Sequence, residues 1–320
     1  MTPTTTSTPQ TATEDAMDGR RLGFVGLGNM GGRMTRRLVE AGLDVLGFDT
    51  VAGRAAEVGA EPAASLGEVA AHTDVILLSL PDSTVVEKVM GGSEGLLRHT
   101  RKGQVIIDLS TSAPASTTRL GAELAERGAT LVDAGISGGA AAADKGTLTL
   151  MTGGDAAVIE SLAWAFDPIS SAVFHMGPLG AGHSTKLLNN FLNAVALSAT
   201  AEVMVAGAKA GLDLHRLLDV LNSSSGVNFA TLNRFPKIVD GDYLEGGLTG
   251  RLMTKDVVAY VEHLGKLGVP SLNAAAPLAA FGLATQLGYG DQISNRVVDA
   301  IGDLAGGIRV HSPEAQGGQE

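Results

Sequence analysis

Gly26-Leu27-Gly28-Asn29-Met30-Gly31 is the stretch of this 320-residue chain that decides its fold. The apolar run 22–25 leads directly into this G-x-G-x-x-G pattern, and a helical stretch with apolar residues on one side follows it. In that setting the first glycine permits a tight turn, the second lets a pyrophosphate approach the backbone, and the third allows the helix to pack closely on the strand. The anion then rests on the helix N-terminus. The motif therefore predicts a dinucleotide-binding loop, although three glycines can also serve a turn alone.

Asp49 follows the next apolar run, 45–48, and lies eighteen residues after Gly31. A carboxylate at this place accepts hydrogen bonds from the ribose hydroxyls of NAD and repels the additional phosphate of NADP. Arg54 lies five residues further on and softens this preference. The sequence therefore favours NAD as the cofactor and leaves NADP as the alternative.

Short apolar runs alternate with helical stretches from residue 21 onward, with glycine or proline at the joints. This alternation predicts a parallel sheet covered by helices, because the runs are continuous, as in strands that are buried on both faces. The expected strands are 22–25, 45–48, 75–80, 105–109, 130–134, 148–152 and 173–176. After Met176 we expect only helices, over 183–210, 213–223, 228–239, 251–267, 271–287 and 291–304.

The predicted fold class is therefore α/β, with an N-terminal Rossmann-like, doubly wound and mostly parallel sheet followed by an all-α C-terminal domain. Four segments are expected along the chain. They are a disordered N-terminal tail over 1–20, an NAD(P)-binding Rossmann domain over 21–182, the all-α domain over 183–305 and a loose C-terminal tail over 306–320.

Composition and charge exclude several classes of protein. Lys and Arg number 23 against 34 Asp and Glu, a formal net charge of −11, so the basic surface that nucleic-acid binding requires is missing in bulk. The absence of cysteine excludes disulfides, zinc–thiolate and iron–sulfur sites and cysteine nucleophiles, and the histidines show no metal-ligand spacing. Polar residues interrupt the most apolar stretch, 191–210, so we expect a buried helix and no membrane span. The first residues do not resemble a signal peptide, which favours a cytoplasmic protein.

Polar motifs follow the later strands, at the carboxyl ends where an open parallel sheet collects ligands. Leu80-Pro81 also fits a simple strand terminator, and Ser110-Thr111 also fits a helix cap before a proline. The segment 135–139 matches the G-x-S-x-G elbow of hydrolases, but the helix after it is short and the first turn already carries a dinucleotide fingerprint. The alternative is an anion cradle for a substrate carboxylate, made by Ser137 and the backbone N–H groups of Gly138 and Gly139.

The glycine-rich segment 177–182 leads into a helix that bears Lys186 and Asn190. Residues four apart share one helix face, and an amine and an amide are costly to bury on an apolar helix without a purpose. The alternative is a lysine that extends to solvent beside a structural asparagine. Lys255-Asp256 is a second charged pair on an apolar helix, for which we expect an ordinary exposed pair. Among the histidines only His183, one turn before Lys186, is placed near this group.

These motifs, taken together and in order across residues 22–300, resemble those of the β-hydroxyacid dehydrogenase family. Members of this family include 3-hydroxyisobutyrate dehydrogenase and tartronate semialdehyde reductase. The residues that carry the resemblance are 26–34, 133–139, 146–149, 177–190 and 255–256.

The resemblance implies reversible oxidation of a small 3-hydroxy carboxylic acid to its semialdehyde or keto acid, with NAD or NADP. By analogy, Lys186 is the general acid and base, Asn190 anchors the substrate, and Ser137, Gly138 and Gly139 bind its carboxylate. The analogous cofactor contacts beyond the glycine loop are Leu80, Pro81, Thr111 and Lys255, and Asp256 helps to order the site. The family also implies a homodimer or homotetramer built through the helical domain, which contributes to substrate binding.

The sequence departs from the family pattern in three places. Gly135-Ile136 stands where the family commonly has Pro-Val, which predicts a reshaped backbone in the anion cradle. The segment 225–229 lacks the larger aromatic residue often found there, and Gly246-Gly247 replaces a common Gly-Phe; both changes are expected to enlarge the substrate pocket and so bear on the identity of the substrate. Three other readings stay open. An imine or ketone reductase on the same fold usually has Asp or Tyr in place of Lys186, a non-catalytic NAD-binding module typically loses this lysine, and a hydrolase would use Ser137 as its nucleophile.

Overall fold

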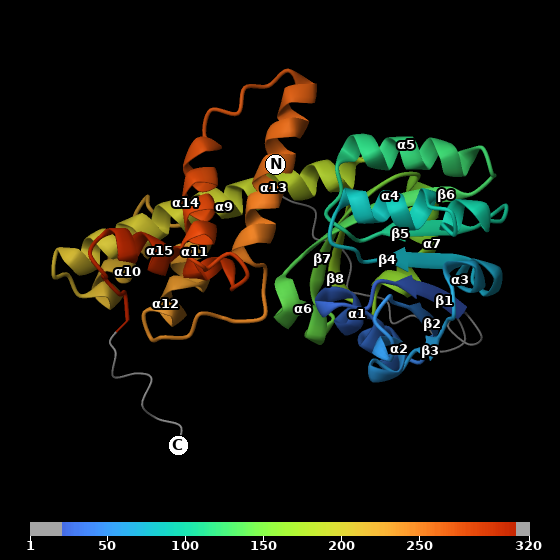
Figure 1. The fold of residues 1–320 in the computed structure, drawn as a ribbon, viewed down its shortest axis with the longest axis horizontal. Coiled ribbons are helices and arrows are strands. Elements are labelled where there is room, and N and C mark those ends of the chain that lie inside the picture. Colours follow the sequence, from blue (N-terminus) through green and yellow to red (C-terminus); the bar gives the residue numbers. More distant parts are fainter. Residues whose placement is uncertain (1–20, 312–320) are drawn as a thin grey trace, which may run out of the picture. The chain divides into compact units, whose positions relative to one another are not determined.

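The computed structural model describes residues 21–311, which form two compact units. The first unit ends at His183 and the second begins at Ser184 (Figure 1). The tail predicted over 1–20 and most of the tail predicted over 306–320 lie outside the described residues.

The first unit is built on one eight-stranded sheet with the order β3-β2-β1-β4-β5-β6-β7-β8. All neighbouring strands are parallel except β6 and β7, which are antiparallel, so the predicted doubly wound and mostly parallel sheet is confirmed. The strands are β1 (Arg21–Val25), β2 (Asp44–Phe48), β3 (Glu61–Pro62), β4 (Val75–Leu78), β5 (Val105–Asp108), β6 (Thr130–Ser137), β7 (Leu148–Gly153) and β8 (Ser170–His175).

Helices cover both faces of this sheet, which explains why its central strands are apolar throughout. One apolar cluster joins the sheet to α1 (Asn29–Glu40), α2 (Arg54–Glu57), α6 (Gly139–Lys145), α7 (Ala156–Ser161) and α8 (Ala163–Phe166). A second cluster joins the opposite face to α3 (Leu66–His72), α4 (Ser83–Gly91), η2 (Leu96–Arg98) and α5 (Pro114–Ala125). The glycine motif lies where β1 runs into α1 (Figure 1).

Two features of the sheet differ from the expectation. The two-residue strand β3 was not predicted, because both its residues are exposed and one is a proline, which is depleted in strands except at edges. Strand β6 is longer than predicted, and it carries the chain through Gly135 and Ile136 to Ser137, where it pairs with the antiparallel strand β7.

Over residues 184–311 the regular elements of the second unit are all helices, as predicted. Its helices are α9 (Ala181–Lys209, which begins in the last residues of the first unit), α10 (Leu214–Asn222), α11 (Phe229–Asn233), α12 (Phe235–Ile238), α13 (Gly250–Leu267), α14 (Ala275–Gln286), η3 (Ser294–Arg296) and α15 (Val297–Leu304). The single helix predicted over 228–239 is divided into α11 and α12, because Pro236 cannot donate the backbone hydrogen bond that would continue the helix.

Helix α9 is long and apolar enough to cross a membrane by length and composition. Half of its most apolar window is buried inside the structure. Its residues Ala194, Leu197, Ala201 and Met204 are fully buried in the apolar core of the helical unit. We therefore assign α9 to the core of this unit.

Candidate active site

The glycine loop between β1 and α1 has the close approaches that the motif predicts. Gly26 has a φ of +89°, and a Cβ atom there would lie 2.3 Å from the carbonyl oxygen of Ser79. A Cβ atom on Gly31 would lie only 1.8 Å from the carbonyl oxygen of Gly26. Both positions therefore exclude every residue except glycine.

Gly28 shows that this loop fits the phosphates of a dinucleotide. No atom lies within 4 Å of the place where its Cβ would be, so the space beside the backbone is open. Gly28 is also the N-cap residue of α1, and no side chain caps the first backbone N–H groups of that helix. Uncapped N–H groups at a helix N-terminus attract anions. The residues present therefore fit a bound pyrophosphate.

Asp49 follows β2 and holds the same loop in place. Its Oδ2 accepts a hydrogen bond from the backbone N–H of Leu27 at 2.7 Å, and its Oδ1 accepts one from Val51 at 2.8 Å. The side chain is only partly buried, and each carboxylate oxygen has a second lone pair. Asp49 can therefore support the loop and still accept hydrogen bonds from a ribose.

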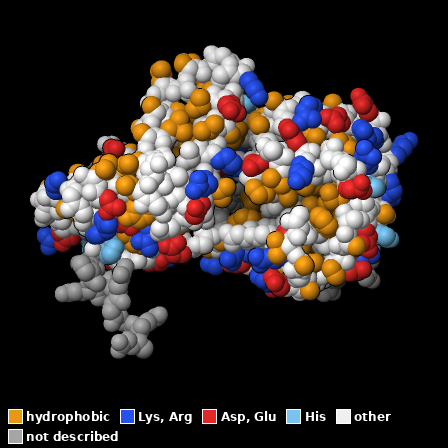
Figure 2. Space-filling model, in the orientation of Figure 1, with side chains coloured by type: hydrophobic (Ala, Val, Ile, Leu, Met, Phe, Trp, Pro, Cys, Tyr) orange, Lys and Arg blue, Asp and Glu red, His pale blue; other side chains and the backbone are white. Residues whose placement is uncertain are grey.

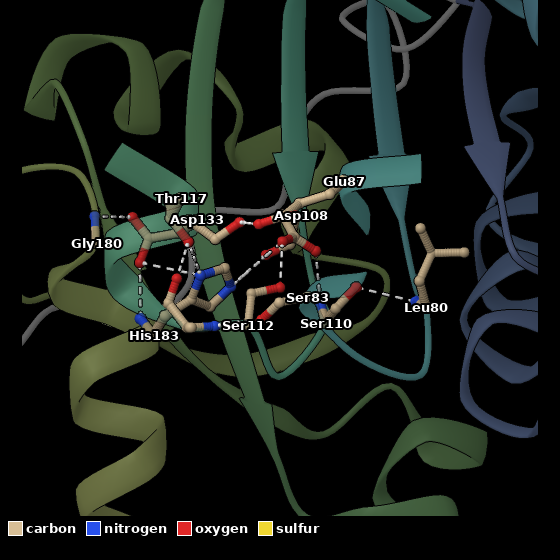
Figure 3. A network of polar contacts seen from close by, with 12 residues as sticks. Leu80, Ser83, Glu87, Asp108, Ser110, Ser112, Thr117, Asp133, Gly180 and His183 are labelled. Carbon is tan, nitrogen blue, oxygen red and sulfur yellow. Dashed lines mark hydrogen bonds and ion pairs between the residues drawn. The ribbon is translucent and has the colours of Figure 1, made fainter. Parts of the chain in front are cut away.

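A network of buried polar side chains lies at the end of β5 and beside the middle of β6 (Figure 3). Asp108, the last residue of β5, accepts hydrogen bonds from the N–H of Ser110 at 3.0 Å and from the hydroxyl of Ser112 at 2.7 Å. The Ser110 hydroxyl in turn accepts a hydrogen bond from the N–H of Leu80 at 2.9 Å. The network thus fixes the backbone of the 80–81 and 110–112 segments, to which the predicted cofactor contacts Leu80, Pro81 and Thr111 belong.

Asp133, in the middle of β6, anchors the beginning of α9 to the sheet. This carboxylate is fully buried, and it accepts hydrogen bonds from the backbone N–H groups of Gly180 and His183, both at 2.7 Å (Figure 3). It thereby accepts hydrogen bonds from backbone N–H groups at the start of the helix, as a capping side chain does. Gly153 and Gly182 leave room for it, because Cβ atoms there would lie 2.4 and 2.9 Å from its oxygens.

His183 completes this network and has no free ring nitrogen. The imidazole is fully buried, with Nδ1 2.7 Å from the Thr117 hydroxyl and Nε2 3.1 Å from the carbonyl oxygen of Asp108. Its ring therefore braces the helix against β5 and α5. The sequence predicted no role for Asp108 or Asp133. The one signal was their position, because each lies two residues before a predicted site segment, Ser110-Thr111 and 135–139 respectively.

Ser137 ends β6, and the exposed Gly138 and Gly139 begin the turn into α6. Both glycines have positive φ values, 125° and 68°, so this turn depends on them. Within residues 21–311, Ser137 makes no hydrogen bond to a histidine, which a hydrolase nucleophile would require. The geometry therefore favours the anion cradle over the hydrolase elbow.

The helical unit carries the second polar group of the predicted site. Asn190 on α9 donates a hydrogen bond from Nδ2 to Oδ2 of Asp256 on α13, at 2.6 Å. Lys255 Nζ lies 3.1 Å from Oδ1 of the same carboxylate. The expectation of an ordinary exposed pair at 255–256 is wrong, because Asp256 is only 1% exposed.

Lys186 lies one turn before Asn190 on α9 and is partly buried. The pKa of this lysine is lowered from 10.5 to about 8, mainly because the amine is buried; the Asp256 carboxylate opposes this shift, and the positive charge of Lys255 adds to it. A lysine with such a pKa exchanges a proton near neutral pH, as a general acid or base must.

The structure thus contains two separate groups of predicted residues. In the first unit the carboxyl ends of parallel strands lead into the glycine loop, Asp49, the 80–81 segment and Thr111, and Ser137 is the last residue of β6. Lys186, Asn190, Lys255 and Asp256 lie in the helical unit. Among the described residues there is no cluster of three or more His, Asp or Glu side chains that could hold a metal ion.

Two family models match the chain and together cover most of it. Residues 21–177 match the NAD binding domain of 6-phosphogluconate dehydrogenase. Residues 180–301 match a domain described as the NAD-binding region of NADP-dependent 3-hydroxyisobutyrate dehydrogenase.

Named relatives extend over most of the chain. A 2-(hydroxymethyl)glutarate dehydrogenase from Eubacterium barkeri is 36% identical over 271 residues, which are 83% of this chain and 87% of the relative. An NAD-dependent L-serine dehydrogenase from Pseudomonas aeruginosa is 34% identical over 85% of this chain and 95% of its own.

Solved structures share the same architecture. A 3-hydroxyisobutyrate dehydrogenase from Mycobacterium tuberculosis, with L-serine, has a TM-score of 0.80 and 28% identity over 87% of this chain and 98% of its own. An imine reductase from Pseudomonas sp. has a TM-score of 0.58 over 88% of this chain and 99% of its own, and at 19% identity it shares the fold alone.

Proposed function

The chain belongs to the β-hydroxyacid dehydrogenase family of NAD(P)-dependent oxidoreductases, and from that premise we propose that Lys186 is the general acid and base with which it reversibly oxidises a small 3-hydroxy carboxylic acid. The observation that carries this proposal is the group around Lys186 in the helical unit. There a lysine with a pKa of about 8 lies one helical turn from an asparagine that a buried carboxylate holds in place.

The proposed reaction requires a proton to leave the substrate hydroxyl while a hydride leaves the same carbon. The nicotinamide of the cofactor, when bound, accepts that hydride or supplies it in the reverse direction. The neutral amine of Lys186 takes the hydroxyl proton during oxidation, and the ammonium form returns it during reduction. Burial makes the neutral amine available from about pH 8, more than two units below the usual pKa of lysine.

Asn190 has the role of orienting the reacting oxygen. Asp256 accepts one of its amide hydrogens at 2.6 Å, which fixes the rotation of the side chain. The remaining amide groups then face the substrate in a defined orientation. Lys255 pairs with the same carboxylate and adds positive charge that acts on Lys186.

In this proposal the first unit binds the cofactor and the substrate carboxylate. The glycine loop and the uncapped start of α1 hold the pyrophosphate, Asp49 holds the ribose, and Leu80, Pro81 and Thr111 complete the contacts. Asp49 makes NAD the preferred cofactor over NADP. Ser137 and the N–H groups of Gly138 and Gly139 bind the carboxylate.

The direct test is the absorbance of the reduced nicotinamide during turnover of a panel of small 3-hydroxy acids and their semialdehydes, with NAD and NADP in parallel. The expected result is reduction of NAD by at least one acid, with weaker use of NADP. If the pure protein binds NAD but oxidises none of the acids, the assigned chemistry is wrong. Turnover of a cyclic imine without dependence on a carboxylate would indicate an imine reductase instead.

We also propose that the protein is a cytoplasmic homodimer or homotetramer assembled through its helical unit. Apolar side chains gather on the surface over α13 and α14 in Figure 2. Large apolar side chains on α13 and in the segment that follows it are exposed: Val258, Leu267, Val269 and Leu272. Exposed apolar residues that lie together mark interaction surfaces. Light scattering coupled to gel filtration measures the oligomer, and a monomer at working concentration would contradict this assembly.

A further inference from the structure

Arg234 lies between α11 and α12 and is held by neutral partners only. Its Nη1 donates a hydrogen bond to Oδ1 of Asn295 at 2.7 Å, and its Nη2 donates one to Oδ1 of Asn193 at 3.1 Å. The guanidinium carbon also lies 5.8 Å from the centre of the Phe229 ring. Across residues 21–311 no carboxylate forms an ion pair with this side chain.

A partly buried cation without a counter-ion is an expensive arrangement. Transfer of a charge out of water costs free energy, and hydrogen bonds to neutral amide oxygens offset this cost only in part. The burial is strong enough to lower the pKa of Arg234 to about 10, a value at which the side chain is still positively charged at neutral pH. Other arginines of the same unit, by contrast, have carboxylate partners: Arg251 pairs with Asp291, and Arg296 with Asp299.

Arg234 also keeps hydrogen-bonding capacity for a ligand. A guanidinium has five N–H groups in a planar fork that matches a carboxylate. Only two of these five groups bond to other residues of the described chain. Asn295 is 2% exposed and is itself held by the carbonyl oxygen of Tyr243 at 2.8 Å, so the fork has a fixed orientation.

The position of Arg234 relates it to the proposed site through α9. Lys186, Asn190 and Asn193 are spaced four and three residues apart, so they lie along one face of this helix. Asn193, which contacts Arg234, follows Asn190 by a rise of about 4.5 Å along the helix axis. The residue that Arg234 contacts on α9 therefore lies about one helical turn beyond the asparagine that is proposed to hold the reacting oxygen.

We propose that Arg234 is a specificity-determining residue that binds a second carboxylate of the substrate, so that the preferred substrates are dicarboxylic 3-hydroxy acids. The proposal rests on the function assigned to Lys186 and Asn190 above. A 3-hydroxy acid with a short arm ending in a carboxylate places this second anion one helical turn from the reacting carbon. The anion supplies, through charge-assisted hydrogen bonds, the counter-ion that residues 21–311 do not provide.

The test compares two substrates of matched shape on the full-length enzyme. One is 2-(hydroxymethyl)glutarate, which is 3-hydroxypropanoate with a 2-carboxyethyl group at C2. The other carries a propyl group at C2, so the two acids differ only in the terminal carboxylate. The expected result is a kcat/KM about 10- to 100-fold higher for the diacid, mainly through a lower KM. A ratio below about threefold on the parent enzyme would overturn the proposal.

Variants at Arg234 distinguish binding of the second carboxylate from a purely structural role of this side chain. Arg234→Gln removes the charge, and we expect it to abolish the preference for the diacid while the monoacid keeps its kcat/KM within about threefold. Arg234→Lys should restore part of the preference, because it restores the charge. The matched control is Arg216→Gln, whose side chain is 87% exposed and should leave both substrates unaffected. An equal loss for both acids in Arg234→Gln would indicate a structural role and overturn the proposal.

A binding measurement covers the case in which the variants do not fold or the parent enzyme turns over neither acid. Calorimetry on the parent protein with saturating cofactor compares glutarate with pentanoate, and we expect glutarate to bind at least tenfold more tightly. Absence of turnover refutes the proposed function, whereas equal binding of glutarate and pentanoate refutes the role of Arg234. The two failures are therefore distinguishable.

Discussion

The two units of the chain each bury charged side chains, but they surround those charges differently. In the first unit Asp108 and Asp133 accept hydrogen bonds on both carboxylate oxygens, and the His183 ring between them is bonded on both nitrogens. In the helical unit Lys186 has its pKa lowered by burial, and Arg234 is bonded to neutral amides alone. The polar groups of the first unit thus have their hydrogen bonds filled by the protein itself. Lys186 and Arg234 keep N–H groups with which they can exchange a proton or bind a ligand.

This difference distinguishes side chains that stabilise the fold from side chains that are able to bind a ligand or exchange a proton. A buried polar network whose members are all satisfied makes the surrounding structure rigid and leaves nothing with which to bind a ligand. The network of Asp133 and His183 fixes the start of α9, the helix that carries Lys186 three residues further on. Groups that are only partly satisfied cost stability, and they persist at sites that bind or react. Four measurements test this difference between the two units.

Lys186→Ala should produce the largest effect. Without the proposed acid and base, turnover should fall by about 10²- to 10⁴-fold, while the affinity for NAD changes little because the predicted nucleotide contacts lie mainly in the first unit. Steady-state kinetics and calorimetric titration with NAD measure the two quantities. Turnover that survives intact would remove Lys186 from the chemistry.

Asp133→Ala should change stability more than any substitution in the Lys186 group. It leaves the buried N–H groups of Gly180 and His183 without an acceptor, at a cost of about 3 kcal/mol in the free energy of unfolding. Urea denaturation measures this loss. The matched control is Asp144→Ala, which removes only the exposed ion pair with Arg33 and should cost less than about 1 kcal/mol. Equal losses in both variants would mean that the buried network does not brace α9.

The pH profile should report Lys186 directly. Its lowered pKa means that the reactive neutral amine disappears as the pH falls through about 8. The kcat/KM for oxidation should therefore drop by about tenfold per pH unit below 8 and level off above it. Reduction, which needs the ammonium form, should decline above pH 8. In Lys186→Arg the residual activity should lose this dependence, and a parent profile that is flat from pH 6 to 9 would contradict the assignment.

Asp49→Ala should give the smallest effect of the four. Loss of the ribose acceptor should lower kcat/KM with NAD by about 5- to 10-fold and raise it with NADP, because the carboxylate no longer repels the additional phosphate. Asp49 also accepts a hydrogen bond from Leu27 in the glycine loop, so a change in this loop is the competing explanation. Parallel losses with both cofactors would indicate that loop effect, whereas opposite changes support recognition of the ribose.

Most of the fold could be predicted because its signals are local. The seven expected strands and the helical second half follow from apolar runs, helical periodicity and glycine joints, and the structure confirms them. The misses also have local causes. Strand β3 has no apolar residue, and Pro236 interrupts a helix whose pattern otherwise continues across it.

Site residues could be predicted where they belong to a sequence motif. The side chains that surround them in the fold could not be predicted. Lys186 and Asn190 could be named from one helix face, yet nothing near them in sequence indicated the buried carboxylate of Asp256, 66 residues beyond Asn190. For the same reason Asp256 was expected to be exposed, since a Lys-Asp pair on a helix usually faces solvent.

Neighbouring residues encode the glycine loop, the alternation that builds the sheet, the helical second half and the family, so each of these could be predicted from the sequence. Which charges are satisfied depends on contacts between distant segments. Asp133 meets Gly180 and His183, which lie 47 and 50 residues later, and Arg234 meets Asn295, 61 residues later. Burial and pairing of a charge depend on the segments that the fold brings beside it, and no local pattern specifies those segments.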